Sequence, residues 1–285
     1  MARRLLPLKG CRQGGRSSRE RPFAHRRNCS SGADTSTADY TAARMARGFE
    51  RQVQAREEYQ RRNPSWVDSV SLYRSLIAKV STQGARILDL GCGRNGLHGD
   101  DLSCAPGAFV SGVDPDPAAL AGNTVISRRV VGSGEDLPFA SGAFDIVASA
   151  WVLEHLDHPG LVFSEVHRVL APGGHFVFLT PNAWNYNAWM IRAIPHRWHA
   201  GLTRRLYGRG EGDGYPVRYR ANSSASLHRL LNAAGFSHAD LTYNGDPSYI
   251  AFNRPVLEAS FGIERVLDAQ RLRGARVHIL GVARA

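Results

Sequence analysis

Three glycines and one carboxylate follow an apolar run at residues 86–90 and suggest a site for a nucleotide-like ligand. Gly91, Gly93 and Gly96 have the spacing G-x-G-x-x-G, which allows a tight strand-to-helix turn and a close approach of ligand to backbone. Asp89 stands two residues before the first glycine, at the end of the expected strand, where open α/β sheets bind ligands. A carboxylate there would repel the pyrophosphate of a dinucleotide by a few kcal/mol, so it favours a cationic ligand.

A second carboxylate, Asp114, follows another apolar run at residues 108–113. At the end of a strand it can accept hydrogen bonds from both hydroxyls of a ribose, which a nicotinamide dinucleotide also requires. Asp114 therefore predicts a ribose without choosing the cofactor. It can also cap the helix expected at residues 116–120, but Asp116 can do this instead, so the two interpretations are compatible.

Strand and helix patterns alternate along the rest of the chain and indicate an α/β fold. A charged, solvated helix is expected at residues 48–62, and an amphipathic helix that packs on the sheet at residues 66–80. Downstream, strands are expected at residues 144–150, 175–180, 240–243 and 277–282, and helices at 163–170, 223–234 and 256–272. The segment 181–222 has no clear periodicity, and its length is typical of a lid or a substrate-binding insertion.

Six sequence blocks between residues 86 and 182 resemble the class I S-adenosylmethionine-dependent methyltransferases, in particular the type 11 and ubiquinone-menaquinone methyltransferase-like subgroup. In order they are DLGCGRNG, GVDPD, GEDLPF, FDIV, VLEHL and EVHRVLAPGG. The resemblance implies a Rossmann-like, doubly wound, seven-stranded and mainly parallel sheet, with an antiparallel last strand and helices on both faces. It also implies S-adenosylmethionine as the cofactor, whose cationic sulfonium agrees with the argument from Asp89.

The resemblance assigns cofactor-binding roles block by block. It implies that the methionine part is held at the first block, the ribose at the second and the adenine at the third; the residues are Asp89, Gly91 and Gly93, then Asp114, then Gly134, Glu135 and Asp136. Many family members have glycine where this chain has Asn95, and Asp where it has Ser133. The partner of the adenine amino group stays open between Ser133, Glu135 and Asp136.

Methyl transfer from a sulfonium needs alignment and, for a protonated acceptor, a base. Candidates follow the strand expected at residues 144–150: Glu154, His155 and His158. His155 is preferred because imidazole titrates near neutral pH. As alternatives, His155 could bond only to a backbone carbonyl, and Glu154 could be a solvent residue or, as in some quinone-pathway O-methyltransferases, hold a divalent metal. No metal site is predicted, because further ligands cannot be identified.

The net charge of +11 is concentrated at the start of the 285-residue chain. Residues 1–38 contain nine basic and two acidic side chains, and their composition predicts disorder. We therefore expect a disordered basic tail at residues 1–44 and a methyltransferase domain at 45–285. The tail is compatible with a mitochondrial presequence, a nucleic-acid-binding arm, or an extension upstream of a true start at Met45.

Cysteine spacing and hydropathy bear on the compartment of the protein. Cys11, Cys29, Cys92 and Cys104 show neither metal-ligand spacing nor a disulfide framework, which suits a reduced cytoplasm, or the mitochondrial matrix if the tail is a presequence. Cys92 lies between two loop glycines and is expected to fill space rather than to react. No apolar run approaches membrane-spanning length, so we expect a soluble or peripheral protein.

These observations favour methyl transfer to a small molecule, with oxygen as the preferred acceptor atom and a quinone, lipid or glycosylated metabolite as the acceptor. Arginines and aromatic residues in 181–222 could bind an anionic group and a ring, or could rest on a membrane. Two alternatives are a nicotinamide-dependent oxidoreductase and a noncatalytic binding module whose basic tail binds RNA. Nucleic acid is not expected as a partner of the folded domain.

Overall fold

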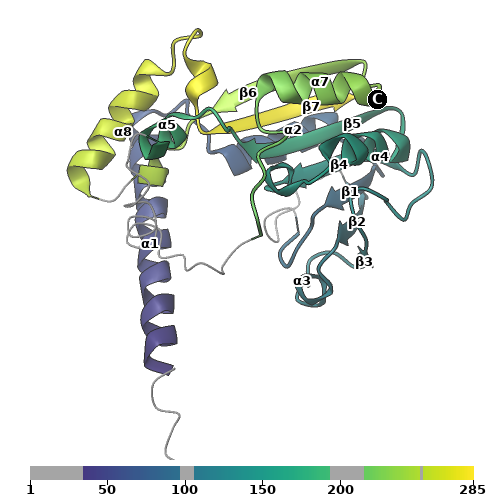
Figure 1. Ribbon diagram of the computed structural model, residues 1–285, viewed down its shortest axis with the longest axis horizontal. Coiled ribbons are helices and arrows are strands. Elements are labelled where there is room, and N and C mark those ends of the chain that lie inside the picture. Colours follow the sequence, from purple (N-terminus) through teal and green to yellow (C-terminus); the bar gives the residue numbers. More distant parts are fainter. Residues whose placement is uncertain (1–34, 97–105, 193–214, 251–252) are drawn as a thin grey trace, which may run out of the picture. The chain divides into compact units, whose positions relative to one another are not determined.

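The computed structural model describes residues 35–96, 106–192, 215–250 and 253–285 (Figure 1). The chain divides into two units, residues 1–40 and 41–285, and the second contains the sheet. The first helix, α1 (Thr35–Arg62), begins at residue 35, within the segment expected as a tail. The three alanines and one arginine of residues 35–44 are good helix formers and continue the helix expected at 48–62. Residues 1–34 lie outside the described part of the chain.

The described residues form a seven-stranded sheet with the strand order β3-β2-β1-β4-β5-β7-β6. Strands β3, β2, β1, β4 and β5 are parallel, and β7 lies antiparallel between β5 and β6. This confirms the seven-stranded, mainly parallel sheet with an antiparallel last strand. The strands are β1 (Arg86–Leu90), β2 (Phe109–Asp114), β3 (Arg128–Val131), β4 (Phe144–Ala150), β5 (Leu170–Pro181), β6 (His238–Asn244) and β7 (His278–Arg284).

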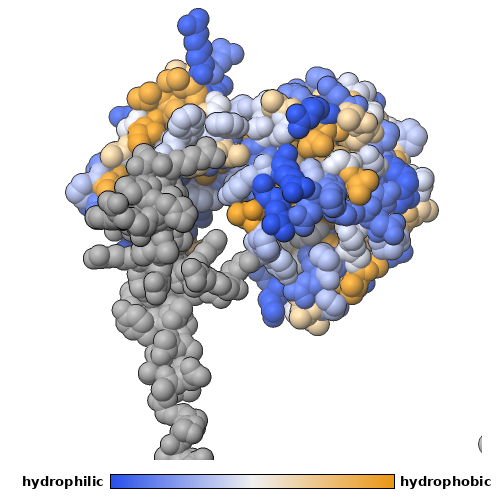
Figure 2. All heavy atoms as spheres, viewed as in Figure 1, coloured by the Kyte–Doolittle hydropathy of each residue, from blue (hydrophilic) through white to orange (hydrophobic). Residues whose placement is uncertain are grey.

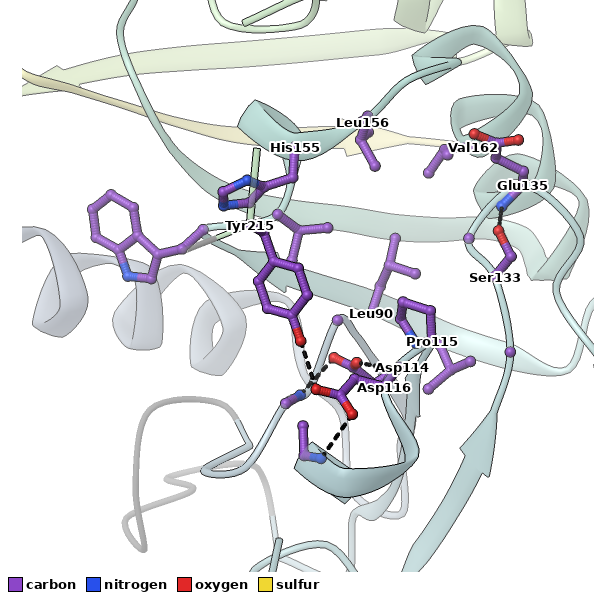
Figure 3. A pocket seen from close by; sticks show the side chains of 18 of the residues that line it. Leu90, Asp114, Pro115, Asp116, Ser133, Glu135, His155, Leu156, Val162 and Tyr215 are labelled. Carbon is purple, nitrogen blue, oxygen red and sulfur yellow. Dashed lines mark hydrogen bonds between the residues drawn. The ribbon is translucent and has the colours of Figure 1, made fainter. Parts of the chain in front are cut away.

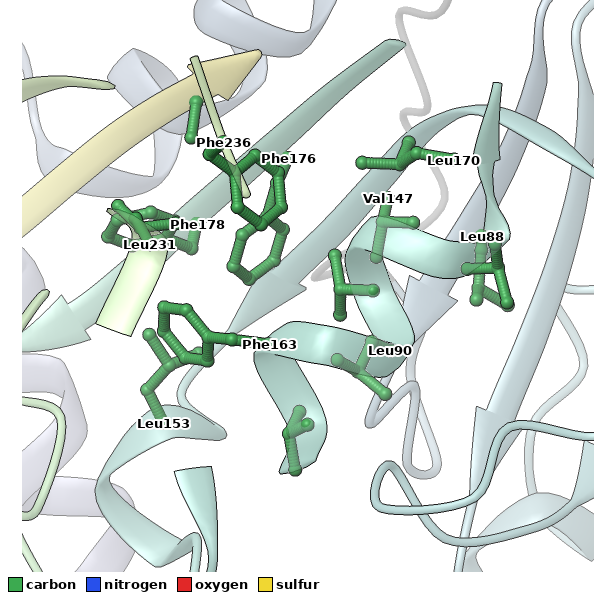
Figure 4. Close-up of a cluster of buried hydrophobic side chains, with 14 of the residues drawn as sticks. Leu88, Leu90, Val147, Leu153, Phe163, Leu170, Phe176, Phe178, Leu231 and Phe236 are labelled. Carbon is green, nitrogen blue, oxygen red and sulfur yellow. The ribbon is translucent and has the colours of Figure 1, made fainter. Parts of the chain in front are cut away.

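The two faces of the sheet bury separate hydrophobic clusters, as expected for strands covered on both sides. Side chains alternate along β5: Phe176 and Phe178 face the cluster around α4 (Pro159–Val169) and α7 (Ser224–Ala234), which pack against each other (Figures 1 and 4). Val177 and Leu179 face the other cluster, around α2 (Ser69–Val80). Helices therefore cover both faces, and the expected amphipathic helix at 66–80 packs on the sheet as predicted.

A charged network joins α1 to α8 (Arg254–Val266) on the surface. Arg62 contacts Glu258 at 2.6 Å, and Arg254 contacts Glu58 at 2.6 Å. Helix α8 is shorter than the expected 256–272, because the chain leaves the helix after Val266 and then forms only a short 3-10 turn, η3 (Arg273–Ala275). The remaining short elements are α3 (Pro117–Ala121), α5 (Tyr186–Arg192), η1 (Leu153–His155) and η2 (Pro247–Ile250).

The side of the molecule seen in Figure 2 is mainly hydrophilic where it is coloured, with hydrophobic residues in separate small patches. The large apolar side chains are instead concentrated inside: Phe163, Phe176 and Phe178 are completely buried. Ring packing joins them, with centroids 5.6 Å apart for Phe163 and Phe176 and 5.0 Å apart for Phe176 and Phe178. The same cluster contains Leu90 at the end of β1 and Leu153 shortly after β4, next to the strand ends where the cavity lies.

The close approach of β7 to β5 predicts a specific effect of one substitution. A Cβ at Gly281 would overlap the Phe178 ring, so Gly281→Ala should lower the free energy of unfolding by about 1–3 kcal/mol in urea titrations. Gly262→Ala, on an exposed face of α8 with open space around it, serves as the control and should stabilise by roughly 0.5–1 kcal/mol. Adding Phe178→Leu should make the loss from Gly281→Ala smaller; strict additivity would contradict the packing argument.

Candidate active site

A cavity of about 650 Å³ lies where β1, β2 and β4 end. Its wall contains Gly91 and Gly93 after β1, Asp114 at the end of β2, and Trp151 directly after β4. Ser133 and Glu135 lie on the opposite side of the cavity from His155 and Tyr215 (Figure 3). The carboxyl ends of neighbouring parallel strands therefore form the site, as the sequence predicts.

The glycine turn after β1 uses left-handed backbone angles at all three glycines. The φ angles are 74° at Gly91, 49° at Gly93 and 55° at Gly96. A Cβ at Gly91 would overlap Val152, whereas one at Gly93 would meet only the Asp114 carboxylate, at 4.0 Å. Among the described residues, positive φ outside glycine occurs at Trp151 and Tyr219 and not at Asn95. Gly96, the residue after Asn95, thus supplies the left-handed angle at the end of the turn.

Asp114 is oriented by two backbone N–H donors. Gly93 N donates to Oδ2 and Asp116 N donates to Oδ1, both at 2.9 Å. Each carboxylate oxygen keeps a lone pair for a further donor. The Asp116 carboxylate instead caps α3 by accepting from Ala118 N at 2.8 Å. Asp116 therefore caps the helix, which leaves Asp114 available for the ribose role that the sequence predicts.

Asp89, in contrast, does not belong to the cavity wall. It stands in β1 opposite Gly112 of β2 and Ala148 of β4, and it is 3% exposed. It alternates with Leu88 and Leu90, which face the cluster around α4 and α7, so it lies on the other face of the sheet. Asp89 therefore lies behind the turn rather than on the cavity wall, and its role in cofactor binding stays a prediction.

The third predicted block contributes part of its residues. Ser133, Gly134 and Glu135 line the cavity, and the Ser133 hydroxyl accepts from Glu135 N at 3.1 Å. Asp136 is not among the described residues that line it; its N–H donates to Ser133 O in the turn. Of the three candidates for the partner of an adenine amino group, Ser133 and Glu135 therefore reach the wall.

His155 and Glu154 are adjacent in η1 but face different surroundings. His155 lines the cavity, and its Nδ1 lies 3.0 Å from the backbone oxygen of Pro216. Glu154 does not line the cavity; its carboxyl is buried and accepts from Thr180 Oγ1 at 3.2 Å. His158 does not line it either and precedes α4. Successive residues of a 3-10 turn point about 120° apart, which separates Glu154 from His155.

The buried Glu154 carboxyl is electrostatically linked to His155. Desolvation raises the pKa of Glu154, and the His155 charge opposes this shift. Glu154 Oε1 lies 3.9 Å from His155 Nε2. A carboxylate at this position would stabilise a protonated imidazole on His155.

The cavity also contains residues to which the sequence assigned no separate role. Trp151 has φ 60°, donates its backbone N–H to Leu179 O at 3.0 Å and lines the wall. Tyr215 donates its hydroxyl to Asp116 Oδ2 at 2.7 Å, and Arg218 also lines the wall (Figure 3). Tyr215 and Arg218 belong to the aromatic and basic segment 181–222, but its composition did not indicate which members reach the site.

Cys92 is buried within the turn, as expected for a space-filling residue. Its side chain is 5% exposed and packs where a Cβ of Gly112 would stand. Burial, followed by the charges of Asp89 and Asp114, raises the pKa of the thiol to about 12. Cys11, Cys29 and Cys104 lie outside the described residues.

Two further observations concern metals and membranes. The part of the chain that the structure describes contains no group of three or more His, Cys, Asp or Glu residues arranged to hold a metal ion. Within the same residues, every helix is too short or too polar to span a bilayer.

Comparison with known proteins identifies related sequences and folds. Residues 88–178 match the family model described as a methyltransferase domain. A probable S-adenosylmethionine-dependent methyltransferase of Mycolicibacterium smegmatis is 36% identical over 160 residues, 55% of this chain and 54% of that protein. A ubiquinone biosynthesis O-methyltransferase of Pseudomonas aeruginosa is 30% identical over 141 residues, 46% of this chain and 54% of that protein. The chain spans about half the length of the curated relatives it matches.

A solved structure has the same fold. A protein of Thermotoga maritima, described as an S-adenosylmethionine-dependent methyltransferase and possible histamine N-methyltransferase, aligns with a TM-score of 0.50 and 16% identity. The alignment covers 84% of this chain and 98% of that one. At this identity the likeness shows the fold alone.

The raised pKa of Cys92 predicts an unreactive thiol. In a background with Cys11→Ser, Cys29→Ser and Cys104→Ser, the native protein should react with an aromatic disulfide reagent at neutral pH on the order of a thousandfold more slowly than free cysteine, because little thiolate is present. Unfolding in urea should restore the ordinary rate. Rapid labelling of the native protein would contradict both the burial and the raised pKa.

Proposed function

We propose that the protein is an S-adenosylmethionine-dependent enzyme that methylates an oxygen atom of a small molecule, because residues 88–178 match a methyltransferase domain and the sheet has the fold of a solved methyltransferase. The observation that carries the proposal is the joint position of Asp114, the glycine turn and His155 on one cavity. The first two suit the methyl donor, and the third offers a base for the acceptor.

The cavity residues fit S-adenosylmethionine. The lone pairs that Asp114 retains suit the two ribose hydroxyls, and Gly93 leaves open space beside that carboxylate. Apolar side chains at Leu90, Val113 and Val162 provide surfaces for the adenine, with Ser133 and Glu135 as polar partners. We assign the methionine part to the turn around Gly91. A side chain at position 91 would overlap Val152, so the turn has room there only for glycine.

The protein residues supply alignment and proton removal. When bound, the cofactor supplies a methyl group activated by its sulfonium. His155 accepts the proton of the acceptor hydroxyl, and its Nε2 is the accepting atom because Nδ1 faces the Pro216 carbonyl, which cannot donate. The resulting imidazolium is stabilised by the Glu154 carboxylate at 3.9 Å. Glu154 is thus a positioning and electrostatic residue in this proposal.

The acceptor is proposed to be a quinone-type, lipid or glycosylated metabolite. Trp151, His155 and Tyr215 place three aromatic rings on the wall, which suits a planar or ring-containing molecule. Arg218 also lines the cavity, but its Nε lies 2.8 Å from Asp157 Oδ1. An anionic group on the acceptor would therefore have to bind the Arg218 guanidinium together with the Asp157 carboxylate. The ubiquinone biosynthesis O-methyltransferase relative supports an oxygen acceptor. Peripheral contact with a membrane remains part of the proposal for a lipid acceptor.

The acceptor class is open to a direct experiment. The purified protein is incubated with S-adenosylmethionine labelled in the methyl group and with separate panels of hydroquinones, lipid extracts and glycosides. Label should enter an oxygen-linked methyl group in one panel. Transfer to nitrogen or carbon would overturn the O-methylation proposal, and binding of the cofactor without any transfer would favour the noncatalytic alternative.

The bonding of Asp114 predicts its contribution to cofactor affinity. In Asp114→Asn the charge is lost and one oxygen acceptor becomes a donor, so the affinity for S-adenosylhomocysteine should fall by roughly 10- to 100-fold in calorimetric titrations. Asp240→Asn, on the exposed side of β6, is the control and should leave the affinity unchanged. Equal affinities for wild type and Asp114→Asn would refute the ribose assignment.

The assignment of the base is tested at His155. His155→Gln retains a polar side chain but cannot take a proton near neutral pH, so kcat should fall by about 10²–10⁴ while S-adenosylhomocysteine affinity changes little. Turnover is measured with the acceptor found in the panels. His228→Gln, on α7 away from the cavity, is the matched control. Undiminished turnover in His155→Gln would remove His155 from the mechanism.

A further inference from the structure

Residues 215–220, here called the strap, cross the cavity wall and are fastened to it on both sides of Pro216. On one side, Tyr215 donates its hydroxyl to Asp116 Oδ2 at 2.7 Å. On the other, Arg218 N and Tyr219 N donate to Glu154 O at 2.6 and 3.1 Å. The two partners lie after different strands of the sheet: Asp116 follows β2 and Glu154 follows β4. The strap thus bridges the ends of β2 and β4.

Side chains strengthen the second fastening. Arg218 Nε lies 2.8 Å from Asp157 Oδ1, and Arg220 Nη1 donates to the Asp157 backbone oxygen at 2.6 Å. Tyr219 has φ 54°, a conformation that non-glycine residues rarely adopt and that persists only when neighbouring contacts hold it. The chain around Pro216 is therefore held in one defined position over η1.

Pro216 presents a single polar group to the cavity wall. Proline has no N–H, and its ring fixes φ, so only its carbonyl can bond to a neighbour. That carbonyl lies 3.0 Å from Nδ1 of His155. Because a carbonyl oxygen can only accept, this bond requires the proton on Nδ1 and leaves the Nε2 lone pair of a neutral imidazole unprotonated.

We infer that the seated strap selects the tautomer of His155, so that Nε2 becomes the proton-accepting atom only when residues 215–220 are fastened over the cavity. Pro216 is then a positioning residue that acts through its carbonyl, and Tyr215 and Arg218 are the side chains that keep it in place. The inference rests on the proposed role of His155 as the base. It assigns the strap a part in the reaction beyond enclosing the ligand.

The ring packing on the other side of His155 agrees with this assignment. The Tyr215 and His155 rings are 6.0 Å apart and inclined by 66°, so the first strap residue also limits rotation of the imidazole. Glu154 Oε1 lies 3.9 Å from Nε2, where it favours the protonated imidazole that follows proton uptake. When the strap lifts, the bond from Nδ1 and the ring contact are lost together, and the tautomer is no longer fixed.

The tautomer is measured directly by long-range ¹H–¹⁵N correlation NMR on protein labelled with ¹⁵N-histidine, at mildly alkaline pH and in the presence of S-adenosylhomocysteine. The His155 signals are those that disappear in His155→Gln. Wild type should show a protonated Nδ1 and an unprotonated Nε2. A protonated Nε2 in the wild-type protein would overturn the inference.

Unfastening the strap supplies the second test. Tyr215→Phe combined with Arg218→Ala removes the two side-chain fastenings, and the His155 signals should change to a mixture of tautomers. Tyr215 is 62% exposed and the Arg218 side chain 44%, so the domain should remain folded. Arg86→Ala removes a comparably exposed pair, Arg86–Asp145, away from the cavity, and should leave the His155 signals unchanged.

The outcomes separate this inference from the proposed function. If unfastening leaves the Nδ1 proton in place while His155→Gln abolishes turnover, the strap inference fails and the base assignment stands. If His155→Gln retains full turnover, the base assignment fails whatever the tautomer. If unfastening produces the mixed tautomers and lowers kcat with little change in S-adenosylhomocysteine affinity, both are supported.

Discussion

The Asp114 carboxylate links the ends of β1 and β2, two of the three strand ends at which the cavity lies. Parallel pairing places Leu90 of β1 beside Val113 of β2, and the first N–H of the glycine turn donates to Val113 O at 2.8 Å. Asp114 then accepts one N–H from that turn and one from the start of α3. Because our proposal assigns the remaining lone pairs of the same carboxylate to the ribose, a change at Asp114 should alter both the shape of the turn and the affinity for the cofactor.

The opposite wall, at the end of β4, depends on a buried polar arrangement. Trp151 packs edge-to-face on His278, with ring centroids 4.8 Å apart. His278 bonds through Nδ1 to Ser69 Oγ at 2.8 Å and through Nε2 to Tyr249 OH at 2.9 Å, and burial lowers its pKa to about 4. A neutral imidazole with both nitrogens bonded thus supports the Trp151 backbone in its unusual left-handed conformation.

Much of the fold followed from local patterns. Apolar runs predicted β1, β2 and β4, helical spacing predicted α2, and the glycine after residue 234 marked the end of α7. The position of the edge strand β3 was not predicted, because Arg128 and Arg129 are exposed and show no apolar pattern. Two helix ends differ from the expectation: α8 ends at Val266 rather than at 272, and α1 begins at Thr35 rather than at 48. Composition alone does not show where a helix begins or ends.

Motif spacing places a residue relative to the end of its own strand, and the four residues Gly91, Gly93, Asp114 and His155, predicted in this way, all line the cavity. The folded chain shows in addition that Asp89, Asp136 and Glu154 do not line it and that Tyr215 and Pro216 do. Strand twist and turn geometry set the direction of each side chain, and neither can be read from spacing. Contacts between residues about sixty to a hundred positions apart leave no local pattern in the sequence.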